Sequence, residues 1–109
     1  MVASQWGGMI KQINGVFTVC IAGEIDAASA GRFRAYLLGA VSMARHQMTV
    51  DLRAVQYLDS SAIHALLAAC DAAEARDVRI TADALGLPRR VIELAGLAFL
   101  LEEQPEPVA

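Results

Sequence analysis

The fold is decided by one stretch of sequence, Val50-Asp51-Leu52-Arg53-Ala54-Val55-Gln56-Tyr57-Leu58-Asp59-Ser60-Ser61-Ala62-Ile63-His64-Ala65-Leu66-Leu67. Its first part continues an alternating strand in which Met48, Val50 and Leu52 are apolar, and a short connection leads to Asp59-Ser60-Ser61. Asp and Ser are preferred N-cap residues because their side-chain oxygens accept the unpaired N–H groups of a helix's first turn. We therefore expect a helix to begin directly after a buried strand.

The residues behind this cap have the apolar spacing of an amphipathic helix that ends around residues 75–77. The stripe predicted to be buried follows the i, i+3, i+4, i+7 rule and consists of Ile63, Leu66, Leu67, Cys70 and Ala73. A serine hydroxyl then lies at a helix N-terminus, where backbone N–H groups and the helix dipole favour an added negative charge. This position suits the attachment of a phosphate.

Upstream of this stretch, the sequence predicts a β-hairpin after a loose leader at residues 1–8. Residues 9–13 and 16–22 alternate like strands, and Asn14-Gly15 joins them. Asn-Gly is a strong hairpin signal because both residues tolerate positive φ angles. Gly23-Glu24-Ile25-Asp26 is expected to end the second strand.

A first helix is expected between the hairpin and the central stretch. Asp26 or Ser29 can cap it, and it extends to about Ala44. Its predicted inner stripe is Phe33, Leu37, Ala40, Val41 and Ala44.

Downstream, the sequence predicts a fourth strand at residues 78–82 and a last helix that begins near Pro88 and stops at Gly96. The inner face predicted for that helix is Leu87, Val91, Leu94 and Ala95. Residues 98–101 are an optional closing strand. The acidic, proline-bearing tail at residues 102–109 is expected to fray.

The expected element order is therefore β-β-α-β-α-β-α in a single domain over residues 1–109. Helices that connect consecutive strands are right-handed crossovers between parallel neighbours. We expect an α/β (α+β) fold with a mixed sheet of four to five strands and helices mainly on one face, the other face being wetter.

Composition and charge exclude several classes of function. The net charge is −3, and the largest cationic cluster is Arg89-Arg90, so direct nucleic-acid binding is not expected. No apolar run approaches the ~20 residues that span a bilayer, and the N-terminus does not resemble a signal peptide. Cys20 and Cys70 have neither metal-site spacing nor disulfide-scaffold density, and they are predicted on opposite sheet faces and unlinked. We expect a cytoplasmic monomer or weak dimer with no cofactor and no metal.

These motifs together resemble the STAS domain family, in particular the small stand-alone anti-sigma factor antagonists of bacteria. The resemblance covers roughly residues 9–101. It rests on Gly23-Glu24-Ile25-Asp26, Val50-Asp51-Leu52, Leu58-Asp59-Ser60-Ser61 and the run from Leu87 to Leu97. The Asp-Ser-Ser element at a strand-to-helix junction is the specific part.

The resemblance implies a phosphorylation switch at Ser60, the serine directly after the Asp. In the family, an anti-sigma factor that is itself a serine kinase phosphorylates this residue. The unphosphorylated antagonist sequesters the kinase and frees a sigma factor, and a phosphatase of the PP2C type resets the cycle. The implied partner surface comprises Asp26, Asp59, Ser60, Ser61 and His64.

This chain departs from the family pattern behind the two serines. The family commonly has Gly-Leu-Gly there, whereas this chain has Ala62-Ile63-His64. Loss of two glycines should stiffen the first helical turn, because Gly costs ~1 kcal/mol relative to Ala in a helix. The change also adds an imidazole one turn beyond Ser60.

Several of these residues also have a simpler structural interpretation. Ser60 is a candidate helix cap as well as a phosphoacceptor, while Ser61 is interpreted as a structural hydroxyl and Asp59 as the N-cap. Asp26 either caps the first helix or belongs to the partner surface. His64 is interpreted as a half-exposed helix residue.

Two other functions compete with the antagonist. The first is an enzyme, because Ser60 and His64 lie four residues apart, the spacing of a nucleophile and its base. The sequence shows neither an orienting acid nor a Gly-x-Ser-x-Gly elbow, so we do not expect an enzyme. The other alternative is a STAS accessory subunit of a transporter or signalling assembly, bound to its partner without a phosphorylation switch.

Overall fold

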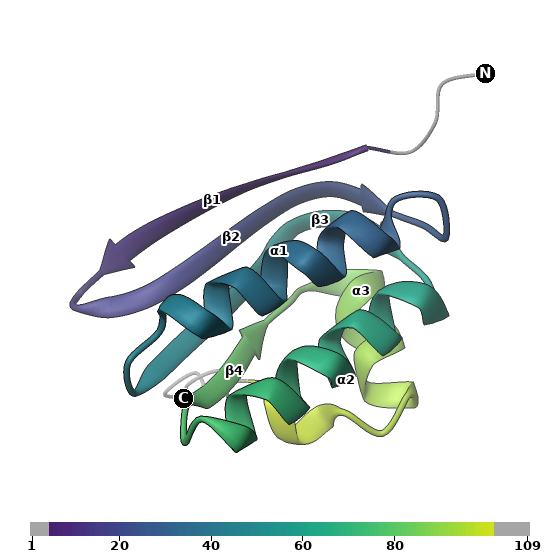
Figure 1. Ribbon diagram of the computed structural model, residues 1–109. Helices are drawn as coiled ribbons and strands as arrows, with labels where there is room; N and C mark the ends of the chain where they lie inside the picture. Colours follow the sequence, from purple (N-terminus) through teal and green to yellow (C-terminus); the bar gives the residue numbers. More distant parts are fainter. Residues whose placement is uncertain (1–4, 102–109) are drawn as a thin grey trace, which may run out of the picture.

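The structure is a computed structural model that describes residues 5–101. The predicted order β-β-α-β-α-β-α is confirmed (Figure 1). The elements are β1 (Trp6–Ile13), β2 (Val16–Ile25), α1 (Ala30–Met43), β3 (Gln47–Leu58), α2 (Ser60–Ala75), β4 (Arg79–Asp83), α3 (Gly86–Leu94) and a 3₁₀ helix, η1 (Ala98–Leu100). The predicted frayed tail, residues 102–109, lies outside the described residues.

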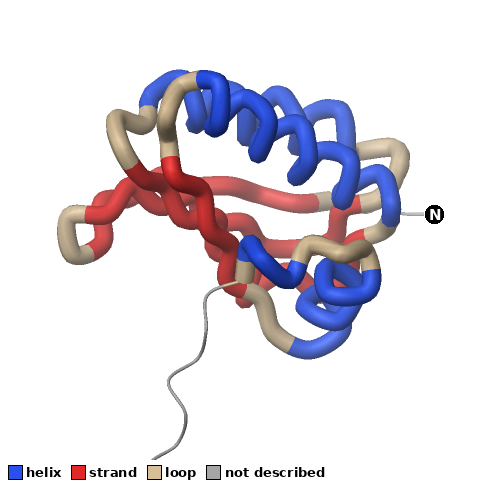
Figure 2. Tube along the Cα trace, turned by 90° about the horizontal axis from the view of Figure 1, so that it is seen from below, coloured by secondary structure: helices blue, strands red, loops and turns tan. Residues whose placement is uncertain are grey.

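The four strands form one mixed sheet in the order β1-β2-β3-β4. β1 and β2 are antiparallel across the Asn14-Gly15 turn, where both residues have positive φ, 52° and 79°. The β2–β3 and β3–β4 pairs are parallel, so α1 and α2 are the crossovers between them. Both helices cover the same face of the sheet, and α3 lies apart from them (Figure 2). The predicted fold class is confirmed, with four strands.

The core lies between that face and the two long helices. Val19, Ile21, Val50 and Leu52 from the sheet are almost completely buried. The whole predicted inner stripe of α1 is buried with them: Phe33, Leu37, Ala40, Val41 and Ala44.

Three strands are longer than the sequence predicts. β1 begins at Trp6, so residues 6–8 are not part of a loose leader. The Trp6 ring packs edge-on against Phe33 and Tyr36, at centroid distances of 5.7 and 5.4 Å, which holds the start of the strand on α1. β2 continues through Gly23 to Ile25 because register shifts against β3 accommodate the glycine, whose φ is +112°.

β3 also runs further than expected, to Leu58, so no separate connection precedes Asp59. Val55 and Leu58 are buried, and their burial favours continuing the strand up to the helix. The strand therefore leads directly to Asp59, the residue before α2.

The predicted buried stripe of α2 is partly wrong. Ile63, Leu66 and Ala73 are buried, but Leu67 is 39% exposed and Cys70 is only half-buried. Alanines occupy the inner face instead, namely Ala62, Ala65, Ala69 and Ala73. The helix presents its small side chains to the neighbouring elements and leaves Leu67 toward solvent.

The predictions for the C-terminal elements also need correction. Pro88 and Ile92 form the inner face of α3, which packs chiefly on β3. Of the residues predicted there, Val91 is partly buried, whereas Leu87, Leu94 and Ala95 are exposed. The optional closing strand is the 3₁₀ helix η1, after which Leu101 makes one parallel bridge to Ala82.

The sheet face opposite α1 and α2 carries polar groups, as predicted. Arg53 forms ion pairs with Asp51 at 3.0 Å and with Asp83 at 3.4 Å. The hydrogen bonds from Arg53 hold the pKa of Asp51 below its usual range. Cys20 and Cys70 are both free thiols. Within residues 5–101, no helix has the length and apolar character required to cross a bilayer.

Candidate functional site

The carboxyl ends of β2 and β3 bring the predicted site residues to one edge of the sheet. Ile25 and Leu58, the last residues of the two strands, are register partners. Asp26 and Asp59 follow them directly, so the two aspartates leave neighbouring parallel strands at the same edge. Sequence reasoning expected Asp26 near the Ser60 loop, and this register provides the reason.

Asp59 is the N-cap of α2, as predicted. Its Oδ1 accepts hydrogen bonds from the Ser61 N–H at 2.9 Å and the Ala62 N–H at 3.4 Å. Its backbone carbonyl accepts the Ile63 N–H at 3.1 Å, which is the first bond of the helical ladder. The carboxylate therefore satisfies donors that would otherwise be unpaired and places a negative charge at the positive end of the helix dipole.

Ser60 and Ser61 differ in accessibility. Ser60 is the first residue of α2 and is exposed, whereas Ser61 is half-buried. Ala62 and Ile63, which follow them, are buried and fix the first turn in the core. The helix therefore holds the Ser60 hydroxyl outward from a fixed backbone.

Asp26 closes the turn before α1. Its Oδ1 accepts hydrogen bonds from the Ser29 N–H at 3.1 Å and the Ser29 hydroxyl at 3.2 Å. The Ser29 carbonyl in turn accepts the indole N–H of Trp6 at 3.3 Å, and the Asp26 carbonyl accepts the Ala30 N–H at 2.8 Å. Asp26 therefore organises the start of α1, and it follows the strand that neighbours the one leading to α2.

His64 is exposed, one turn along α2 from Ser60. With Ser61 it lines a groove of about 480 Å³ between α1 and α2, whose opposite wall includes Arg34. Sequence reasoning missed Arg34, because its proximity to His64 depends on how two separate helices pack. Asp26, Asp59 and Ser60 do not line this groove. In the part of the chain that the structure describes, no group of three or more His, Cys, Asp or Glu side chains is placed to hold a metal ion.

A sequence model of the STAS domain family matches residues 9–105 of this chain. The match includes most of the hairpin, both strand ends that lead to the aspartates, and the first turn of α2. A search of curated proteins finds no match.

Solved structures of anti-sigma factor antagonists are similar to this chain. An anti-sigma factor antagonist from Mycobacterium paratuberculosis has a TM-score of 0.81 and 26% identity, covering 92% of this chain and 87% of its own. SpoIIAA, an anti-sigma factor antagonist in its unphosphorylated form, has a TM-score of 0.71 and 21% identity, with 92% and 90% covered. The Bacillus cell fate determinant SpoIIAA in the phosphorylated form has a TM-score of 0.65 and 21% identity, with 92% and 93% covered. The likeness to the two SpoIIAA structures is one of fold.

Proposed function

The chain belongs to the STAS domain family, and from this premise we propose that it is an anti-sigma factor antagonist controlled by phosphorylation of Ser60. In this proposal the unphosphorylated form binds an anti-sigma factor serine kinase in the cytoplasm and so frees a sigma factor. The kinase phosphorylates Ser60 and is released, and a PP2C-type phosphatase restores the starting state. The observation that carries the proposal is the exposed Ser60 hydroxyl on the first residue of α2, directly after the Asp59 cap.

The first argument concerns which serine a kinase can reach. Phosphoryl transfer requires the acceptor oxygen to enter the kinase site, and Ser60 is exposed while Ser61 is half-buried. The Ser61 N–H is also held by Asp59 at 2.9 Å, so presenting Ser61 would disturb the cap. The same exposure leaves a phosphate on Ser60 open to a phosphatase.

The second argument concerns the fold, which should tolerate the phosphate. A phosphoserine adds about −1.5 to −2 charges at neutral pH. At a helix N-terminus, attraction to the dipole is worth roughly 0.3–1 kcal/mol, which partly offsets repulsion from the adjacent Asp59 carboxylate. Because Ser60 is exposed, the phosphate remains solvated and α2 keeps its cap.

The third argument concerns the complex, which should not tolerate the phosphate. The proposed partner surface consists of Asp26, Asp59, Ser60, Ser61 and His64, at the edge where β2 and β3 end. It already carries two carboxylates, and docking a partner would desolvate a third anionic group beside them. Like-charge juxtaposition at an interface costs several kcal/mol, and each ~1.4 kcal/mol is a tenfold loss of affinity. One phosphate can therefore separate the complex without unfolding the domain.

The experiment incubates the protein with candidate anti-sigma factor kinases and ATP, maps the phosphorylated residue, and titrates variants against the kinase. Ser60→Ala should bind constitutively and take up no phosphate, and Ser60→Asp should bind weakly yet melt like the parent. Ser61→Ala is the matched control and should still be labelled on Ser60. Label on Ser61 alone, or tight binding by Ser60→Asp, would contradict the proposal and favour a STAS accessory subunit bound without a phosphorylation switch.

A further inference from the structure

The outer edge of β1 is an open edge of the sheet. β1 pairs with β2 on one side, and no other described strand lies on its outer side (Figure 1). Six of its eight residues are exposed, and it contains no proline. Native sheets usually protect such edges with charges, prolines or bulges, because unpaired backbone groups invite another strand.

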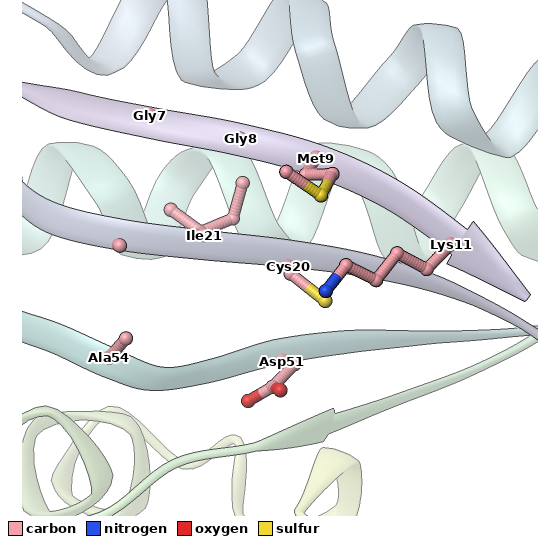
Figure 3. A pocket seen from close by; sticks show the side chains of 9 residues that line it. Gly7, Gly8, Met9, Lys11, Cys20, Ile21, Asp51 and Ala54 are labelled. Atoms are coloured by element: carbon pink, nitrogen blue, oxygen red, sulfur yellow. The ribbon is translucent and has the colours of Figure 1, made fainter. Parts of the chain in front are cut away.

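The single charged residue of β1 does not protect the edge. Figure 3 shows Lys11 extending from β1 across β2 toward Cys20, over the open face of the sheet rather than past the edge. Met9 lies on the same face beside Cys20, its register partner, and is 56% exposed. The edge thus combines free backbone groups with an exposed apolar side chain.

The backbone groups on the outer side can be identified from the register. The Glu24 N–H donates to the Gln5 carbonyl at 2.9 Å, so these residues form a hydrogen-bonded pair. Pairing is continuous from Trp6 to Ile13, and hydrogen-bonded pairs alternate with non-hydrogen-bonded ones in an antiparallel ladder. The N–H and C=O groups that point outward therefore belong to Trp6, Gly8, Ile10 and Gln12.

We propose that β1 pairs antiparallel with β1 of a second copy of this chain, with the two-fold axis at Met9. In this register Trp6 faces Gln12 of the second copy and Gly8 faces its Ile10, so all four outward-pointing residues of each strand are paired. The result is a closed, isologous dimer with a continuous eight-stranded sheet.

The side chains favour this register. Met9 meets Met9 of the second copy as a non-hydrogen-bonded pair, in which Cα atoms approach to about 4.5 Å and side chains contact closely. Lys11 lies opposite Gly7 of the second copy, so like charges are not juxtaposed. On the helix side, Ile10 of the second copy lies opposite Gly8, beside the Tyr36 ring that fills the place of a Gly8 Cβ, so an apolar side chain meets an apolar ring.

The first test measures the molar mass by sedimentation over a series of protein concentrations. The parent should shift with concentration from the 11.6 kDa monomer to twice that mass. Gln12→Pro removes an N–H that points outward and has no partner in β2, and edge strands accept proline at such positions. The substitution should raise the dimer dissociation constant about tenfold or more. Gln12→Thr keeps the N–H and is the control. A parent that stays monomeric throughout, or a dimer that Gln12→Pro does not weaken, would overturn the proposal.

The second test determines the register by disulfide cross-linking in a Cys20→Ser, Cys70→Ser background. Met9→Cys should give a linked dimer on mild oxidation, because only residues at the two-fold axis bring their own Cα atoms within the ~7 Å that a disulfide requires. Ile13→Cys is the control: Ile13 is 41% exposed in the parent, but the register places it opposite Gln5 of the second copy and not opposite the other Ile13. This variant should cross-link at least about tenfold less. Equal cross-linking of the two variants would mean random collision and would refute this register.

Discussion

Replacing Asp59 with alanine should destabilise the domain measurably, although the residue lies in the proposed partner surface and outside the core. The variant loses the Oδ1 atom that accepts the N–H groups of Ser61 and Ala62, at 2.9 and 3.4 Å. Loss of an N-cap costs ~0.5–2 kcal/mol. Because the lost acceptor is a carboxylate at the positive end of a 16-residue helix, we expect the upper part of that range, about 1–2 kcal/mol. For a domain of this size, that free energy lowers the melting temperature by roughly 4 °C or more.

The assay is urea denaturation followed by circular dichroism, with Asp59→Asn as the matched control. Asparagine retains an oxygen acceptor and loses only the charge, so its stability should fall between those of the parent and Asp59→Ala. The Asn variant should also restore part of the kinase binding of Ser60-phosphorylated protein, since one of the repelling charges is gone. The reasoning would be refuted if the free energy of unfolding of Asp59→Ala lay within about 0.3 kcal/mol of the parent's, a difference below the usual range for a lost cap. It would also be refuted if Asp59→Asn were no more stable than Asp59→Ala.

Three further predictions concern single residues. His64→Gly should lower the free energy of unfolding, measured by denaturant titration, by only ~1 kcal/mol through helix propensity, while changing the affinity for the partner. A loss of ~2–5 kcal/mol, typical of a core Leu→Ala, would mean that His64 supports the fold. Gly23→Ala should lower the free energy of unfolding by ~1–3 kcal/mol, because the glycine has a φ of +112° and an added Cβ would collide with the Gln5 carbonyl oxygen. An unchanged melting temperature would show that β2 can relax there. Arg53 lowers the pKa of Asp51 below the ordinary 3.8, so the stability that this pair contributes is present above that pH and is lost as the pH falls through the folded-state pKa. The free energy of unfolding should therefore drop less on acidification in Arg53→Gln than in the parent. An equal dependence on acid in the two proteins would contradict the assignment.

Local sequence signals predicted the parts of the structure that local physics controls. Asn14-Gly15 and Asp59 act within a few residues of themselves, and both do in the structure what the sequence predicts. The inner stripe of α1 was also correct, because Phe33, Leu37 and Val41 follow one another at four-residue intervals and so lie on one face.

The errors occurred where packing between distant segments decides the outcome. α2 has alanines on several faces, so the periodicity of its larger residues placed Leu67 inside, whereas the structure buries Ala65 and Ala69. Similarly, α3 is only nine residues long, and its contact with β3 selects Ile92 over Leu94. The proximity of Arg34 to His64 also arises from helix packing, so no local signal could have identified it.

The protein contains one tryptophan, and the placement of Trp6 makes it an optical reporter of the proposed partner surface. Its indole N–H donates to the Ser29 carbonyl, and the Ser29 hydroxyl donates to Asp26. Indole emission responds to the polarity and hydrogen bonding around the ring, so a partner that docks on Asp26 should change the fluorescence of Trp6 through this chain of contacts. At a fixed protein concentration, binding could then be followed in the unlabelled protein by its own emission.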